Sequence, residues 1–290
     1  MADDGTVLHS PKRLMDARGL RPRKRFGQNF LVDPRFAQRV ADALPEGAFA
    51  LEIGAGTGSL TAALSARTRM TIALEIDRDL VALLRERFEG SPNVDVHEGD
   101  ALEFDVRGAL GSQRPPRAVC GNLPYYITTP LVEHILACAD VWETAVLMVQ
   151  REYARRLTAR PGTAEYASLT VFVSYYCTVE KLFDVGSAGF YPAPAVASSV
   201  VRLTPRTDRG AGVRDEALLL KTIRAAFAQR RKTLANCLTS ARPAGLGGRV
   251  EVEAAIRAAG LDPSIRGERL SLEAFVRLAD ALSENRISLL

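Results

Sequence analysis

The chain has 290 residues, of which 47% are hydrophobic and 25% are charged. This composition is typical of a soluble globular protein with a sizeable core, and it excludes a fibrous, collagen-like or wholly disordered chain. At about 150 residues per domain, the length predicts two domains or one large domain with an appendage.

Basic residues are concentrated in two stretches of the chain. Residues 10–39 hold nine basic and two acidic side chains, and residues 202–249 hold eleven and three, which together give +15. The other 212 residues carry −11, so the net charge of the whole chain is only +4. Segregated positive charge is what a protein needs when one face meets a polyanion. A solvated face with scattered counter-charges is the alternative, and charge alone does not decide between them.

Several classes of protein and site are excluded. The four cysteines form no C-x-x-C pair, and with only three histidines no spacing resembles a zinc site. We expect reduced, mostly buried thiols and no bound metal. The first five residues are polar and acidic, unlike a secretory signal, and no apolar run approaches the roughly 20 residues of a membrane helix. These features predict a cytoplasmic protein with no membrane partner.

Between residues 45 and 150, short β-rich runs alternate with helical patterns. This alternation predicts a parallel sheet with crossover helices. The expected strands are Ala48–Ile53, Met70–Ile76, Asn93–His97, Arg117–Gly121 and Thr144–Gln150. The apolar runs Ala167–Glu180 and Ser198–Leu203 alternate with period two, and we expect them to extend the sheet in antiparallel fashion.

The hydrophobic period becomes helical towards the C-terminus. Apolar residues from Leu219 to Leu238 fall on one face, opposite Arg230, Arg231 and Lys232. Further helices are expected over Glu251–Ala259 and over Leu272–Leu282, with Ser271 as the N-cap of the second. The segment before them, from Thr204 to Gly212, is polar and rich in proline and glycine, as is typical of a linker.

These patterns divide the chain into two domains. The first is an α/β domain, and the second is a small all-helical domain. The boundaries that we assign are 1–204 for the first domain, with 1–22 as a flexible basic arm, 205–212 for the linker and 213–290 for the second domain.

A glycine-rich turn follows the first expected strand and opens a helical pattern. Its spacing, G-x-G-x-G, lacks the third glycine of a dinucleotide fingerprint, because Ser59 stands there. Gly54 and Gly56 let the backbone approach a ligand without a Cβ in the way. A helix N-terminus at this turn favours an anionic group, which in a nucleoside with an amino-acid tail is a carboxylate.

Acidic residues follow at the ends of the next two expected strands. Glu75 stands 21 residues after Gly54, where an acid accepts the hydroxyl hydrogens of a ribose. Asp100 follows the third strand and would accept from an adenine amino group at the rim. Each feature alone also fits a tight turn or a surface acid. Their joint occurrence at the carboxyl ends of successive strands predicts a site for S-adenosylmethionine.

The fourth expected strand leads into Asn122, Leu123, Pro124 and Tyr125. The exocyclic amine of a nucleobase is a poor nucleophile, because its lone pair is delocalised into the ring. Two acceptors, the Asn122 side-chain oxygen and a main-chain carbonyl near Leu123 and Pro124, would localise that lone pair as the amine becomes tetrahedral. Pro124 stiffens the turn, and Tyr125 offers a ring on which a flipped base stacks. A plain turn with a core tyrosine is the alternative.

These residues resemble the ribosomal RNA adenine dimethyltransferases, and most closely their bacterial small-subunit members. The similarity covers nearly the whole chain, from Lys24 to the final helix. It rests on KRFGQNFL from Lys24, GDA from Gly99, GNLPY from Gly121, VQRE from Val149, FYP from Phe190 and AFAQRRKTL from Ala226. The resemblance implies a Rossmann-like S-adenosylmethionine-dependent methyltransferase sheet followed by a helical domain that engages the ribosome.

The family implies a substrate and a set of site residues. The substrate is a pair of adjacent adenines in a hairpin loop near the 3′ end of 16S rRNA, in the 30S subunit or its precursor, each methylated twice at N6. A role in small-subunit biogenesis is then expected. The residues implied for the cofactor are Asn29, Leu31, Gly54, Gly56, Glu75, Asp100, Ala101 and Asn122, and those implied for catalysis are Asn122, Leu123, Pro124, Tyr125 and Phe190.

Phe190 matches the aromatic residue that would face Tyr125 across the flipped adenine, and a core aromatic beside Pro192 is the alternative. Arg23, Lys24 and Arg25 are expected to meet RNA phosphates near the pocket mouth, and Arg230, Arg231 and Lys232 to anchor the second domain. We expect the protein to act as a monomer.

The sequence departs from the family pattern at three positions. Tyr126 stands where many members have asparagine, and Ala195 and Ala197 stand where lysine and aspartate are common. A basic residue is therefore missing beside the pocket, and local contacts to RNA are expected to differ.

Three other functions are open. A 23S rRNA methyltransferase of the antibiotic-resistance type shares the chemistry, but the length of the helical domain and the match from Gln229 to Thr233 are against it. An assembly factor that binds immature 30S particles, with methylation incidental, is a second possibility. A DNA adenine methyltransferase is a third.

Overall fold

The computed structural model describes residues 10–208, 213–243 and 248–287, without the side chains of Lys24 and residues 285–287. The chain forms two compact units. Unit 1 is Met1–Ala154 with Val179–Pro205, and unit 2 is Arg155–Thr178 with Arg206–Leu290.

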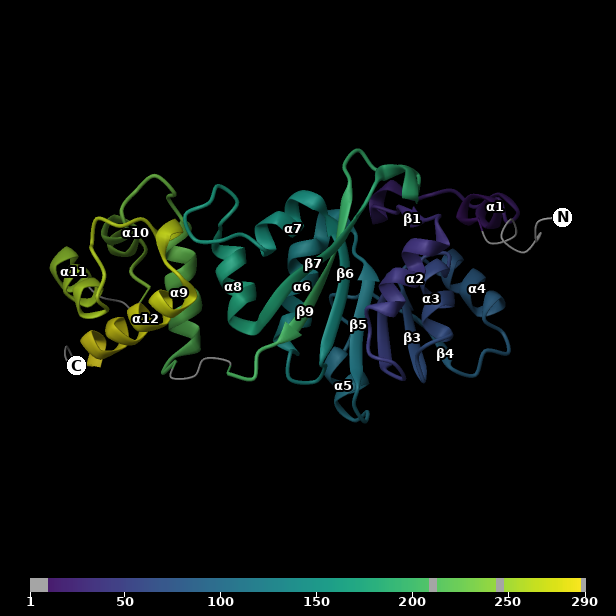
Figure 1. Cartoon of the computed structure of the whole chain (residues 1–290), viewed down its shortest axis with the longest axis horizontal. Helices are drawn as coiled ribbons and strands as arrows, with labels where there is room; N and C mark the ends of the chain where they lie inside the picture. The colour runs from purple at the N-terminus through teal and green to yellow at the C-terminus, as the bar shows by residue number, and fades with distance from the viewer. Residues whose placement is uncertain (1–9, 209–212, 244–247, 288–290) are drawn as a thin grey trace. The chain divides into compact units, whose positions relative to one another are not determined.

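Unit 1 contains a seven-stranded sheet in the order β4-β3-β2-β5-β6-β9-β7 (Figure 1). Strands β2 to β6 pair in parallel, and β9 pairs antiparallel with β6, with Val201 opposite Leu147. The strands are β2 (Phe49–Ile53), β3 (Met70–Glu75), β4 (Val94–Glu98), β5 (Arg117–Asn122), β6 (Thr144–Gln150), β7 (Cys177–Val185) and β9 (Ser198–Pro205). The α/β fold class is confirmed, and each predicted parallel strand ends within one residue of its prediction.

Helices and a small second sheet complete unit 1. Two short strands, β1 (Phe30–Leu31) and β8 (Phe190–Tyr191), pair antiparallel. Three helices begin after an aspartate, residue 33, 77 or 105, whose carboxylate accepts a backbone N–H of the first turn. The helices are α1 (Pro11–Asp16), α2 (Pro34–Asp42), α3 (Ser59–Ser65), α4 (Arg78–Arg87), α5 (Val106–Gly111), α6 (Thr128–Ala137) and α7 (Arg151–Leu157), which runs on into unit 2.

A hydrophobic cluster joins one face of the sheet to α2 and α3. Ala50, Ala118 and Val146 come from β2, β5 and β6, and they pack in one cluster with Val40 of α2 and Leu64 of α3. All five side chains are at most 1% exposed. This packing fixes the helix that follows the glycine turn against the sheet, and so it fixes the turn itself.

Unit 2 is helical. Its core includes the stacked rings of Phe227 and Phe275, with centroids 6.0 Å apart. Its helices are α8 (Ser168–Tyr176), α9 (Glu216–Phe227), α10 (Leu234–Ala241), α11 (Arg249–Ala258) and α12 (Leu272–Ile287). Arg230, Arg231 and Lys232 lie in the turn between α9 and α10, and not along a continuous helical face. In the described part of the chain, no helix has the length and apolar content needed to span a membrane.

The structure corrects the prediction for Ala167–Glu180. This run forms α8 and only then enters β7, because an apolar run of this length fits a buried helix as well as a strand. Residues 167–178 also belong to unit 2, and not to the expected domain 1–204. Tyr166 Oη donates to the Leu270 carbonyl over 2.7 Å, and Tyr176 Oη donates to Glu216 over 2.8 Å.

The expected arm and linker are also changed. Residues 11–16 form α1, and Met15 is 2% exposed in a cluster with Phe30 and Leu80, so this part of the arm is docked. Residues 1–9 lie outside the described residues. The predicted linker begins at the last residue of β9, and its positions 209–212 likewise lie outside the description.

We predict that Gly121→Ala destabilises unit 1. A Cβ on Gly121 would lie 2.4 Å from the Ile53 carbonyl oxygen on the neighbouring strand, and this atom is main chain in a paired strand, which leaves little room to relax. The expected loss is about 1–3 kcal/mol in the free energy of unfolding, measured by chemical denaturation. Gly186→Ala is the control, because its Cβ would meet no described atom within 4 Å. Equal stability of the two variants would contradict the close approach of β2 and β5.

Candidate active site

A cavity of about 230 Å³ lies at the carboxyl ends of β2, β3 and β5. Open α/β sheets bind ligands at this edge. Its wall includes all eight residues predicted for the cofactor and four of the five predicted for catalysis, with Asn122 in both sets: Asn29, Leu31, Gly54, Gly56, Glu75, Asp100, Ala101, Asn122, Leu123, Pro124 and Tyr125.

The glycine turn is folded onto the end of β3. Gly54 and Gly56 have φ of 72° and 60°, a region that side-chain-bearing residues rarely adopt. Gly54 N donates to the Leu74 carbonyl over 2.9 Å. A Cβ on Gly56 would lie 3.0 Å from the Phe30 ring, so glycine lets the N-terminal segment approach the turn.

Glu75 connects three parts of the cavity wall. Its side chain is buried, and Oε2 accepts from Gly56 N over 2.8 Å. Oε1 accepts from the main-chain N–H groups of Ile76 and Asp77, each over 2.9 Å. Burial raises the pKa of Glu75, while these three N–H groups act to lower it. A carboxylate has about four lone-pair directions, so it can accept a further donor from the cavity.

Asn122 presents an acceptor with no partner. Its Nδ2 donates to the Asn29 main-chain oxygen over 2.7 Å. Its Oδ1 is buried and has no hydrogen-bond partner among the residues that the structure describes. A buried acceptor left unpaired costs about 1–3 kcal/mol, so this oxygen is suited to a donor brought by a ligand.

Tyr125 and Asp100 are also held by their neighbours. Tyr125 Oη lies 2.6 Å from Ser198 Oγ, and burial raises the pKa of this phenol. Asp100 Oδ1 accepts from Leu102 N over 2.9 Å. Both residues line the cavity, and these hydrogen bonds orient their side chains.

The cavity wall also includes residues that were not predicted as site residues, among them Glu52 and Tyr126. Glu52 is 2% exposed and accepts from Thr61 Oγ1 over 2.6 Å, and burial, with a smaller contribution from Glu75, raises its pKa to about 8. An acid inside an otherwise apolar strand was the available signal. Tyr126 also lines the cavity and is 58% exposed, and a Cβ on Gly27 would meet its ring at 3.0 Å.

The structure differs from the expectation for Phe190. This residue is 4% exposed and packs in the same hydrophobic cluster as Leu31 and Val40. Its strand β8 pairs with β1, with Phe190 opposite Leu31, which draws the ring into the core. The core alternative therefore describes Phe190 in this structure, and a ring facing Tyr125 is not observed.

The basic residues predicted to meet RNA fall into two groups. Arg23 forms an ion pair with Asp77 over 2.6 Å and a second with Asp79. Arg230 pairs with Glu268 over 2.8 Å. Arg25, Arg231 and Lys232 are exposed, and the Arg25 guanidinium lies 4.6 Å from the centroid of the Phe26 ring. The side chain of Lys24 lies outside the description.

We predict that Glu52→Gln is more stable than wild type at high pH, and that its advantage grows as pH rises. The pKa of Glu52 is about 8 in the folded state against 4.5 ordinarily, so the folded protein holds a proton that the unfolded chain releases. Stability is therefore lost as pH rises through this window, by up to about 1.4 kcal/mol per pH unit, and glutamine removes that loss.

The measurement is chemical denaturation at several pH values from 4 to 9. The difference between Glu52→Gln and wild type should grow with pH and level off near pH 8. Exposed Glu46→Gln is the matched control and should follow wild type. Parallel curves for Glu52→Gln and wild type would show that Glu52 is ionised in the folded protein.

Comparisons with known proteins match most of the chain. Residues 19–282 match the family model described as ribosomal RNA adenine dimethylase. A Pseudomonas aeruginosa protein named Ribosomal RNA small subunit methyltransferase A is 44% identical over 91% of this chain and 96% of its own length. A protein of the same name from Pseudomonas fluorescens is 42% identical, over 91% and 95%.

Two solved structures are similar over most of their length. A dimethyladenosine transferase from Plasmodium falciparum has 25% identity and a TM-score of 0.74, covering 86% of this chain and 95% of that one. The 23S rRNA methyltransferase ErmE has 29% identity and a TM-score of 0.65, covering 88% and 99%. The family model and the two bacterial relatives each span most of the chain, and the chain therefore belongs to the ribosomal RNA adenine dimethylase family.

Proposed function

We propose that this protein transfers methyl groups from S-adenosylmethionine to N6 of two adjacent adenines of 16S rRNA, in the 30S subunit or its precursor. The products are N6,N6-dimethyladenosines, and the reaction belongs to small-subunit biogenesis. Family membership supports adenine methylation. Relatives that are named for the small subunit, and that match over nine-tenths of both chains, support the choice of rRNA.

The residues of the cavity fit S-adenosylmethionine. When bound, this cofactor supplies a methyl group on a positively charged sulfur. Gly54 and Gly56 leave room for its close approach, and Glu75 can accept a further hydrogen bond from a ribose hydroxyl group. Asp100 stands at the rim, where it would accept from the adenine amino group. Asn29, Leu31 and Ala101 would complete the contact.

The unpaired Oδ1 of Asn122 is the observation that carries the proposal. This oxygen would accept an N–H of the adenine amine, which localises the nitrogen lone pair while the nitrogen becomes tetrahedral. The main-chain carbonyl of Leu123 would accept the second N–H, because the neighbouring Pro124 carbonyl already accepts from Ile127 N and Thr128 Oγ1. The amine becomes acidic once it is methylated, so the protein needs no strong base to start the reaction. Tyr125, held at Ser198, would support the flipped base.

RNA contacts are assigned to the exposed basic residues. Arg25, Arg231 and Lys232 would bind phosphates, which position the substrate without reading its sequence. The pairing of Arg23 with two acids makes it a poor phosphate ligand. A monomeric state and a cytoplasmic location stay predictions.

The large-subunit alternative is not favoured. ErmE, a 23S rRNA methyltransferase, is 29% identical to this chain, whereas the relatives named for the small subunit are 42–44% identical.

We predict that Asn122→Ala lowers the rate of methyl transfer by about 10²–10³-fold, because one acceptor for the developing ammonium is removed. The assay uses labelled S-adenosylmethionine with undermethylated 30S, 50S or duplex DNA, followed by mapping of the modified base. Wild type should label N6 of adenine in 30S only. Gln38→Ala, which removes an exposed amide on α2, is the control for the substitution.

Label in 50S alone would refute the small-subunit assignment but would leave methyl transfer to rRNA adenine intact. Label in DNA alone would point to a DNA methyltransferase. A wild-type rate for Asn122→Ala would remove Asn122 from the catalytic site. Thermal unfolding of both variants checks that the fold is intact.

A further inference from the structure

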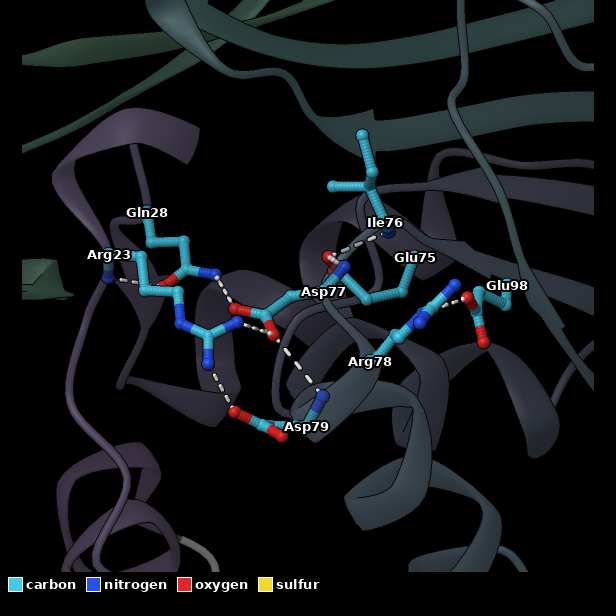
Figure 2. A network of polar contacts seen from close by, with 8 residues as sticks. All are labelled: Arg23, Gln28, Glu75, Ile76, Asp77, Arg78, Asp79 and Glu98. Atoms are coloured by element: carbon cyan, nitrogen blue, oxygen red, sulfur yellow. Dashed lines mark hydrogen bonds and ion pairs between the residues drawn. The ribbon is translucent and has the colours of Figure 1, made fainter.

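Arg23 is bonded to the turn that follows β3, the strand that ends at Glu75 (Figure 2). Its Nη1 donates to Asp77 Oδ1 over 2.6 Å, and its Nη2 donates to Asp79. Gln28 Nε2 donates to the other oxygen of Asp77 over 2.9 Å. Gln28 Oε1 in turn accepts from Arg23 N over 2.7 Å. Arg23 and Gln28 therefore hold one carboxylate between them.

Asp77 is buried where these bonds meet. It is 3% exposed, and a buried carboxylate must be compensated by nearby donors. Its main-chain N–H donates to Glu75 Oε1 over 2.9 Å, while its side chain caps helix α4. Asp77 thus joins the residue proposed to hold the ribose to the segment that contains Arg23 and Gln28.

That segment, residues 23–31, forms one wall of the cavity from residue 26 to residue 31. Its far end is fixed as well, since the Asn29 oxygen accepts from Asn122 and β1 pairs with β8. The Asp77 bonds fix its near end. The wall is therefore attached at both the proposed ribose end and the proposed methyl-transfer end of the cavity.

The charges around Arg23 do not suit a phosphate. Arg23 faces two carboxylates, so the three side chains together carry −1, and an RNA phosphate would be repelled. Separate nitrogens of the planar guanidinium reach the two acids, which a single ammonium cannot do in the same way. This geometry is that of a structural clamp.

We propose that Arg23 and Asp77 are positioning residues for the cofactor. Their ion pair, shared with Gln28, holds the 23–31 segment in the conformation that binds S-adenosylmethionine. The inference rests on the proposed function, because it takes the cavity to be the site of that cofactor. It assigns to Arg23 a role in cofactor affinity that does not depend on RNA.

The test compares Asp77→Asn and Arg23→Gln with wild type in the absence of RNA. Asparagine keeps the size of aspartate and its ability to cap α4, but it removes the charge. Arg23 has a side chain that is 38% exposed, so its replacement is tolerated by the fold. The matched control is Glu98→Gln, which breaks the Arg78–Glu98 pair at the same sheet edge (2.7 Å, Figure 2).

Two measurements are made on each variant. Calorimetry with S-adenosylmethionine should show a Kd raised about tenfold in Asp77→Asn and in Arg23→Gln, and unchanged within twofold in Glu98→Gln. The double variant should be no weaker than the weaker single variant, because both changes break one unit. Trypsin should cut after Arg25 faster in Asp77→Asn than in wild type or Glu98→Gln, with or without cofactor.

Unchanged Kd and unchanged cleavage in Asp77→Asn and Arg23→Gln, with wild type binding the cofactor, would overturn the inference alone. A raised KM for 30S in Arg23→Gln at unchanged cofactor Kd would show that Arg23 acts in RNA binding and not in cofactor binding, which would overturn the inference. Failure of wild type to bind S-adenosylmethionine would overturn the proposed function, and the inference with it. Arg23→Lys should give an intermediate Kd, because lysine keeps the charge but lacks the two separate nitrogens that bond to Asp77 and Asp79.

Discussion

The buried carboxylate of Glu75 is the interaction on which the cavity depends. Its two oxygens accept hydrogen bonds from three main-chain N–H groups, one in the glycine turn after β2 and two directly before α4. Parallel strands bring their carboxyl ends to one edge, but they do not by themselves orient the loops that leave it. A carboxylate at the end of β3 does so, because each of the three donors reduces the cost of its burial and is held in place by it.

The parallel sheet and most of the cavity wall were predictable from the sequence, because strand runs such as Thr144–Gln150 and the turn at Gly54 leave local patterns. Residues 168–176 were mistaken for a strand, since a short apolar run is compatible with either structure until its partners are known. Phe190 was assigned to the site by resemblance, whereas its burial follows from the pairing of β8 with β1. Such long-range pairings have no local signal.

Charge counted along the sequence overstated the positive charge that is free of acidic partners. The stretch 10–39 carries nine basic residues, yet Arg18, Arg23 and Arg35 pair with acids, and the acidic partners of Arg18 and Arg23 all lie in α4 or directly before it. A basic residue in an ion pair contributes little to the field that attracts a polyanion. The positive potential available to RNA therefore comes from fewer residues, such as Arg25, than the total suggests.

The hydrogen bond from Asn122 Nδ2 to the Asn29 carbonyl has a consequence for the polarity of the site. An amide is nearly symmetric in shape, so an asparagine can in general turn its oxygen and nitrogen about without changing its volume. Here a turned amide would place two oxygens against each other, and its nitrogen would face the adenine amine, donor against donor. The Asn29 carbonyl therefore fixes which way the Asn122 amide is turned, and it leaves the amide oxygen as the acceptor that the site offers.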